Sequence, residues 1–154
     1  MREFTKLSPT IWTSKVFQAL TVRERNQFLY LLAGPHQTSA GCCHVPESYA
    51  CGDLGYKPLE YRNNNVRLQA VQLIEFDPET SEVLVVGWFK DNPPMNDKHR
   101  KGTQKEIDRI QSDQLRTASQ TSFDDAWAKY IARQDAKARK DGNYDLNRLR
   151  SRTS

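Results

Sequence analysis

Long apolar stretches are missing from this 154-residue sequence, whose mean hydropathy is −0.80. A membrane-spanning helix needs roughly 20 consecutive apolar residues, and no run approaches that length, so we expect no membrane partner. The first residues, MREFTKLSPTIW, lack the apolar core of a signal peptide. Cysteine is scarce as well, and its odd number, three, favours a reducing compartment over a disulfide framework.

Motifs of catalysis and cofactor binding are also scarce. The sequence has no phosphate loop of the form GxxxxGK[ST], and the three histidines have no evident Ser or Cys partner. Cys42 and Cys43 are adjacent, which is a poor spacing for zinc because neighbouring residues of a strand point to opposite faces. We therefore expect a protein that is not an enzyme, with no catalytic residues, no metal and no cofactor.

The net charge of +4 is concentrated near the C-terminus. Residues 115–154 contain nine Lys or Arg and five Asp or Glu, which leaves no net charge for residues 1–114. A neutral body with a basic end suits an anionic partner, although solvated side chains explain many such segments equally well.

Caps and helix breakers predict the elements before residue 73. They indicate a short helix after Thr13 or Ser14, a second helix between Thr21 and Gly34, a short strand at CCHV, and helices over 47–54 and 58–72. Two β-rich runs, 73–76 and 83–89, flank a turn and predict a hairpin. The order predicts a mainly α fold with a small β-hairpin, in which helices pack beside a two-stranded wing.

The remainder should form C-terminal helices. We expect a polar crossover after residue 89, a helix over 103–115, and a last helix that begins at Ser122 with a capping box to Asp125. From Lys137 the chain should be loose and basic. This gives three regions: 1–92 as a first domain with an N-terminal arm, 93–136 as a helical extension, and 137–154 as a tail. The last helix carries an apolar stripe of four residues: Phe123, Trp127, Tyr130 and Ile131. This stripe is a candidate surface for a partner or a dimer, unless it packs back on the body of its own chain.

Several segments resemble the winged-helix N-terminal domain of phage and prophage replication proteins, the initiators and helicase-loading organisers. The matching segments are the stretch around Trp12, LYLLAGPH, the strand before Pro46, DLGY, LIEFD and WFKDNPPMN. The resemblance covers about residues 5–112. It implies that 1–92 is a winged helix-turn-helix DNA-binding domain, with a role in replication initiation in the cytoplasm of a bacterial host. The sequence departs from the family in two places. Asn64 and Asn65 stand in the helix before the wing, and we expect the helicase-binding module of longer relatives to be absent or reduced to one helix and a basic tail.

In a winged helix, the helix before the wing is the recognition helix and lies in the major groove. Helical phase places Tyr61 and Leu68 on one stripe, with Asn64 and Asn65 at its edge, although the stripe of Leu59 and Val66 offers an alternative phase. With the first phase, the side chains that can read base edges are Arg62, Asn63, Arg67 and Gln69. Candidate phosphate contacts are Lys57, Lys98, Arg100 and Lys101.

The wing argues in part against DNA contact, because it carries four acids and no Lys or Arg: Glu75, Asp77, Glu79 and Glu82. We therefore expect the wing to point away from DNA or to meet a protein. The leading hypothesis is a sequence-specific protein that binds double-stranded DNA, with replication proteins and a homodimer as further partners. The alternatives are a transcriptional regulator with the same domain, and a protein-interaction adaptor that uses the acidic wing and the aromatic helix.

Overall fold

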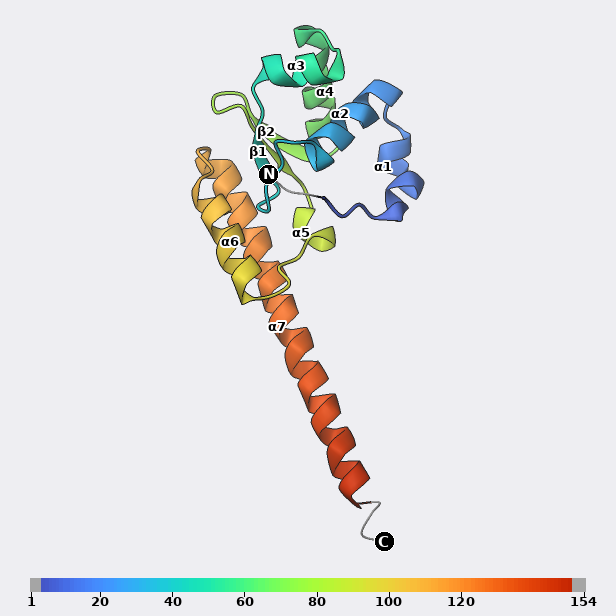
Figure 1. The fold of residues 1–154 in the computed structure, drawn as a ribbon. Coiled ribbons are helices and arrows are strands. Elements are labelled where there is room, and N and C mark those ends of the chain that lie inside the picture. Colours follow the sequence, from blue (N-terminus) through green and yellow to red (C-terminus); the bar gives the residue numbers. More distant parts are fainter. Residues whose placement is uncertain (1–3, 151–154) are drawn as a thin grey trace.

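The computed structural model describes the backbone of residues 4–150 and the side chains of residues 4–140. Figure 1 shows a small body from which one long helix projects. The fold is mainly α with a small β-sheet. In chain order the elements are η1 (Pro9–Thr13), α1 (Lys15–Gln18), α2 (Val22–Ala33), β1 (Cys42–His44), α3 (Glu47–Leu54), α4 (Pro58–Ala70), β2 (Ile74–Asp77), β3 (Glu82–Val85), α5 (Trp88–Asp91), α6 (Asp97–Asp108) and α7 (Asp113–Arg150).

The helices of the body begin and end where local chemistry dictates. Thr21 caps α2 in a full capping box with Glu24, and Gly34 ends that helix. Gly55 closes α3 with a left-handed backbone, φ 68°, which a glycine adopts without strain. Pro58 stands in the first turn of α4. These predictions are confirmed, with α4 ending at Ala70, two residues before the expected position.

The sheet is antiparallel, with the order β1–β3–β2. It therefore has three strands, because β1 pairs with β3 in the register Cys43 to Val83, in addition to the predicted hairpin. All four residues of β3 are buried, since both faces of the strand are covered. Val83 and Val85 belong to the core beneath α2 and α4, while Glu82 and Leu84 face α7.

The second β-rich run is shorter than expected. β3 ends at Val85, and Gly87, with φ 76°, leads into the short helix α5. Trp88 of α5 is buried, donates from Nε1 to the Ser39 carbonyl at 3.0 Å, and packs against Gly41. Gly41 has φ 72°, and a side chain there would meet the Trp88 ring, so this position requires glycine.

The C-terminal helices differ most from the prediction. α6 begins at Asp97, so the expected crossover loop is largely helical, and α7 begins at Asp113 instead of Ser122. Ser122 and Asp125 are interior residues of α7 and cap nothing. From Lys137, where a loose tail is expected, the backbone is still assigned to α7 as far as Arg150; residues 151–154 lie outside the described part.

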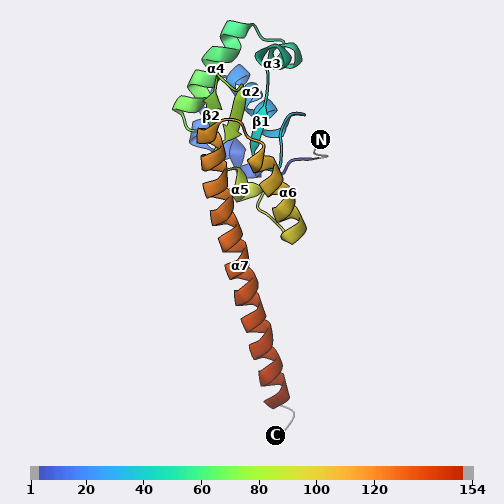
Figure 2. The same cartoon turned by 90° about the vertical axis from the view of Figure 1, so that its left-hand side faces the viewer.

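α6 and α7 run side by side against the sheet, and α7 then leaves the body (Figures 1 and 2). Ser119 of α7 donates to the Ala40 carbonyl at 2.9 Å, and Leu115 and Phe123 are buried in the same core as the sheet. The first part of α7 therefore belongs to the body. No helix among the described residues has the length and apolarity that crossing a membrane requires.

Candidate nucleic-acid interface

α4 presents one face to the core and the other to solvent. Its buried residues are Tyr61, Asn64, Asn65 and Leu68, whereas Leu59 and Val66 are 67% and 70% exposed. The first of the two helical phases is therefore the correct one. Asn64 and Asn65, expected at the edge of the buried stripe, are themselves buried.

A buried hydrogen-bond network explains these asparagines. Gln27 of α2 is fully buried; its Nε2 donates to Asn65 Oδ1 at 2.7 Å and to the Tyr61 carbonyl at 3.1 Å. Gln27 Oε1 in turn accepts from Asn64 Nδ2 at 3.0 Å. One amide of α2 thus holds three groups of α4, and these bonds fix the rotation of α4 about its axis.

The outer face of α4 carries the predicted base-reading residues. Arg62, Asn63, Arg67 and Gln69 are all exposed. Arg62 is not free, however, because Glu47 of α3 binds its guanidinium through two oxygens, at 2.6 and 2.8 Å. This hydrogen-bonded pair lowers the pKa of Glu47. Asn63, Arg67 and Gln69 form no such pair with any described residue, so they are better placed than Arg62 to meet a ligand.

The predicted phosphate contacts do not form one group. Lys57 is exposed at the N-cap of α4, next to the base-reading face. Lys98, Arg100 and Lys101 lie instead in the first turns of α6, far from α4 in both views (Figures 1 and 2). Arg100 and Lys101 each pair with Asp97 at 3.1 Å, and the Arg100 guanidinium covers the Trp127 ring. These three residues therefore do not share a surface with the outer face of α4.

The wing is less acidic at its surface than its sequence indicates. Glu82 is buried, and its carboxylate accepts the backbone N–H of Gln111 at 3.0 Å and of Ser112 at 2.8 Å, just before α7 begins. A helix N-terminus stabilises such a negative charge. Asp77 is half-buried, and a hydrogen bond to Ser112 lowers its pKa. The expectation of four acids facing outward is thus wrong for Glu82, which joins the hairpin to α7.

The aromatic stripe of α7 is divided between core and surface. Phe123 is 2% exposed and contacts Phe89 of α5 at 5.3 Å between ring centroids, so it is a core residue and not a partner surface. Trp127 and Tyr130 are half-buried and stack on each other at 5.0 Å. Ile131 is 42% exposed. Phe123 therefore packs on its own body, whereas Trp127, Tyr130 and Ile131 remain partly exposed.

The three thiols lie in or beside the hydrophobic core. Cys42, Cys43 and Cys51 are free, and burial raises the pKa of Cys43 to about 12 and that of Cys42 further still. Such thiols remain protonated and unreactive at neutral pH. Within residues 4–140, no three His, Cys, Asp or Glu side chains come close enough together to hold a metal ion.

The sequence prediction missed the residue that orients the interface, Gln27. A signal was present, because Gln27 is one turn from Leu31 on the buried side of α2, where an apolar residue is usual. No protein-family model matches the chain, and no curated protein or solved structure matches it either.

Proposed function

We propose that this chain is a non-enzymatic, sequence-specific DNA-binding protein of the winged-helix type, with α4 as its recognition helix. The order α2–β1–α3–α4–β2–β3, with β1 completing the sheet beside β3, supports the assignment. α3 and α4 are joined by three residues, 55–57, as in a helix-turn-helix.

One observation carries the proposal: the outer face of α4 is polar and largely unpaired within the described chain, while its inner face is fixed by directional hydrogen bonds. Arg67 can bond the O6 and N7 atoms of guanine, and Asn63 or Gln69 can bond N6 and N7 of adenine. Val66, 70% exposed between them, suits contact with a thymine methyl group. A rigidly oriented helix is what base reading requires, since a small rotation would misplace every donor.

Within this class, we propose a role in replication initiation of phage or prophage DNA, which rests on the sequence resemblance described above. Footprinting on the origin and on the promoters of the encoding replicon separates this role from transcriptional regulation. The adaptor alternative is less well supported, because two residues of its surface, Glu82 and Phe123, are buried in the body.

The test begins with selection of a preferred site from a randomised duplex library. Asn63→Ala/Arg67→Ala should then weaken binding to that site by about 1–3 kcal/mol for each base that is no longer read, with little change on random duplex. The matched control is Gln114→Ala/Arg109→Ala, which removes the same kinds of group from exposed positions outside α4. If the α4 variant loses affinity equally on both duplexes, or if no site is enriched, α4 does not read bases.

A further inference from the structure

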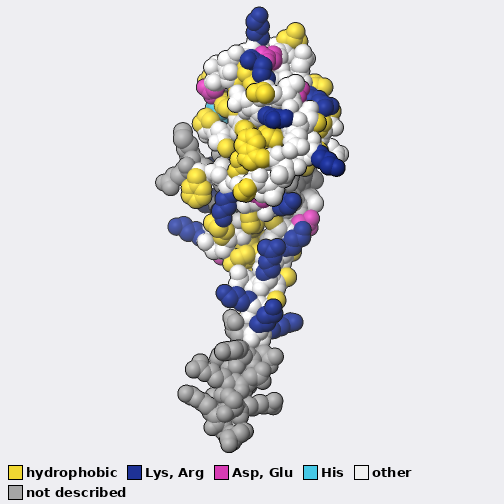
Figure 3. All heavy atoms as spheres, turned by 90° about the vertical axis from the view of Figure 1, so that its right-hand side faces the viewer, with side chains coloured by type: hydrophobic (Ala, Val, Ile, Leu, Met, Phe, Trp, Pro, Cys, Tyr) yellow, Lys and Arg dark blue, Asp and Glu magenta, His cyan; other side chains and the backbone are white. Residues whose placement is uncertain are grey.

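The part of α7 beyond the aromatic stripe carries a row of basic side chains. Lys129, Arg133, Lys137 and Lys140 are spaced by four, four and three residues, which places them on one face of the helix. All four are exposed. At 1.5 Å per residue the row is roughly 17 Å long. Figure 3 shows Lys and Arg side chains gathered along this projecting part of α7.

The charge of this row is unpaired among the residues whose side chains the structure describes. Elsewhere in the described chain several basic side chains are ion-paired: Arg23 with Glu60, Arg62 with Glu47, Arg109 with Glu106, and Arg116 with Asp113. None of the four residues of the row forms an ion pair with any described residue. Asp135 lies within the row's length but about 160° around the helix from Arg133 and Lys137, on the opposite face.

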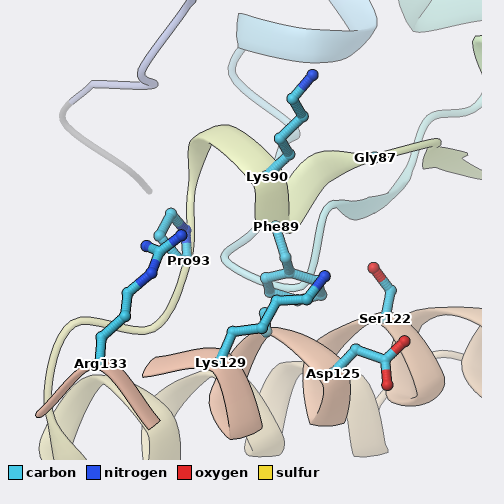
Figure 4. A pocket seen from close by; sticks show the side chains of 9 residues that line it. Gly87, Phe89, Lys90, Pro93, Ser122, Asp125, Lys129 and Arg133 are labelled. Carbon is cyan, nitrogen blue, oxygen red and sulfur yellow. The ribbon is translucent and has the colours of Figure 1, made fainter. Parts of the chain in front are cut away.

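At its upper end the row meets a cleft between α5 and α7. The cleft has a volume of about 280 Å³ and is lined by Lys129, Arg133 and, from α5, Lys90. Figure 4 shows Lys129 and Arg133 rising from α7 toward α5, and one acid, Asp125, beside Lys129 on α7. The side chain of Lys90 points away from α7 in the same view. Two cations, Lys129 and Arg133, against one carboxylate leave this end of the row positive, so the positive charge of the row continues to the edge of the body.

We propose that this surface, the row from Lys129 to Lys140, binds the phosphate backbone of double-stranded nucleic acid without reading its sequence. Duplex DNA carries one charge per roughly 1.7 Å of its axis, so a row roughly 17 Å long faces ample phosphate. The surface stands apart from α4, which lies at the opposite end of the molecule (Figures 1 and 2). The inference does not depend on base reading by α4.

The neighbours of the row favour a duplex over other polyanions. Single-stranded nucleic acid is held by exposed aromatic rings as well as by charge. The rings nearest to the row, Trp127 and Tyr130, are half-buried and stack on each other. The other residues beside the row are alanines: Ala126, Ala132 and Ala136. A membrane-binding helix needs Trp, Phe or Leu on the face opposite its basic residues. Beyond Ile131 that face of α7 offers none of them, because it carries Gln134, Asp135 and Ala138. An acidic protein would require apolar core contacts for a specific interface. Charge alone suffices for a phosphate backbone.

The test compares two variants of the full chain that lose the same charge. One is Lys129→Gln/Arg133→Gln/Lys137→Gln/Lys140→Gln; the control, Lys15→Gln/Lys105→Gln/Arg109→Gln/Arg139→Gln, neutralises four exposed residues outside the row. Glutamine is a good helix former, so both should fold, which circular dichroism checks. Binding to a random-sequence 20-base-pair duplex is measured by fluorescence anisotropy over a range of NaCl concentrations.

The slope of log K against log salt should fall by about 3–4 in the row variant, since each phosphate that is no longer neutralised removes about 0.9. The control should change by less than about 1. Equal slopes for the two variants would overturn the proposal, and so would a wild-type protein that binds poly-glutamate or anionic phosphatidylserine vesicles but not the duplex. In Asn63→Ala/Arg67→Ala the slope of log K against log salt should stay within about 1 of the wild-type value. This variant therefore distinguishes loss of phosphate binding by the row from loss of base reading by α4.

Discussion

Gln27 is the residue whose replacement tests the structure most sharply. In Gln27→Leu the side chain keeps nearly the same volume but loses every bond to α4. Asn65 Oδ1 and Asn64 Nδ2 then remain buried without partners, whereas the Tyr61 carbonyl keeps its position in the helical ladder of α4. A buried polar group left unpaired costs about 1–3 kcal/mol, so two of them cost about 2–6 kcal/mol.

The added apolar surface of leucine offsets part of this loss, and we expect a net destabilisation of about 2–4 kcal/mol. Urea unfolding followed by circular dichroism measures it, since a slope of about 1–3 kcal/mol per molar urea gives a clear shift of the midpoint. Asn63→Ala, an exposed change on the same helix, serves as the control and should stay within about 0.5 kcal/mol.

A second variant makes the reasoning refutable. Gln27→Leu/Asn64→Leu/Asn65→Leu replaces all three partners with apolar groups, and much of the lost stability should return because no polar group of the network is left unpaired. A loss below about 0.5 kcal/mol in Gln27→Leu would show that the network contributes nothing to holding α4. A triple variant no more stable than the single one would show that packing, and not pairing, sets the cost.

Two further predictions concern α7 and the thiols. Phe123→Ala should destabilise the protein by about 3–5 kcal/mol, because it empties a core position beside Phe89, while Ile131→Ala should change stability by less than about 0.5 kcal/mol. The melting shift should not depend on protein concentration; a dimer that dissociates in sedimentation on either change would contradict intrachain packing. The buried thiols should resist Ellman's reagent at pH 8, because a Cys43 pKa of about 12 leaves almost no thiolate. Half-buried Cys51 should therefore react first, and Cys42 and Cys43 should react only in urea. Rapid labelling of Cys42 or Cys43 in the native protein would mean that β1 opens readily.

Local signals predicted most of the body. Thr21 with Glu24, Gly55 and Pro58 act on their own neighbours, so their effects are visible in the sequence. The start of α7 was not predictable in this way, because Glu82 binds the N–H groups of Gln111 and Ser112 across 29 and 30 residues. β1 likewise belongs to the sheet only through its pairing with β3.

The candidate site was predicted in part for the same reason. The phase of α4 followed from the bulk of Tyr61 and Leu68, and this correctly put Asn63 and Gln69 outside. The pairing of Arg62 with Glu47 depends on how α3 and α4 cross, which no local pattern reports. Lys98, Arg100 and Lys101 follow the wing closely in sequence, but α6 carries them to another part of the molecule.

The contact between α2 and α4 has a consequence for how such a protein can diversify. Because the orientation of α4 depends on amide groups at Gln27, Asn64 and Asn65, the residues on its other side are not needed to hold the helix in place. Positions 63, 66, 67, 69 and 70 can therefore change together without altering the direction in which they point. Selection can therefore change which bases the exposed residues of α4 recognise, while the buried contacts between α2 and α4 stay the same.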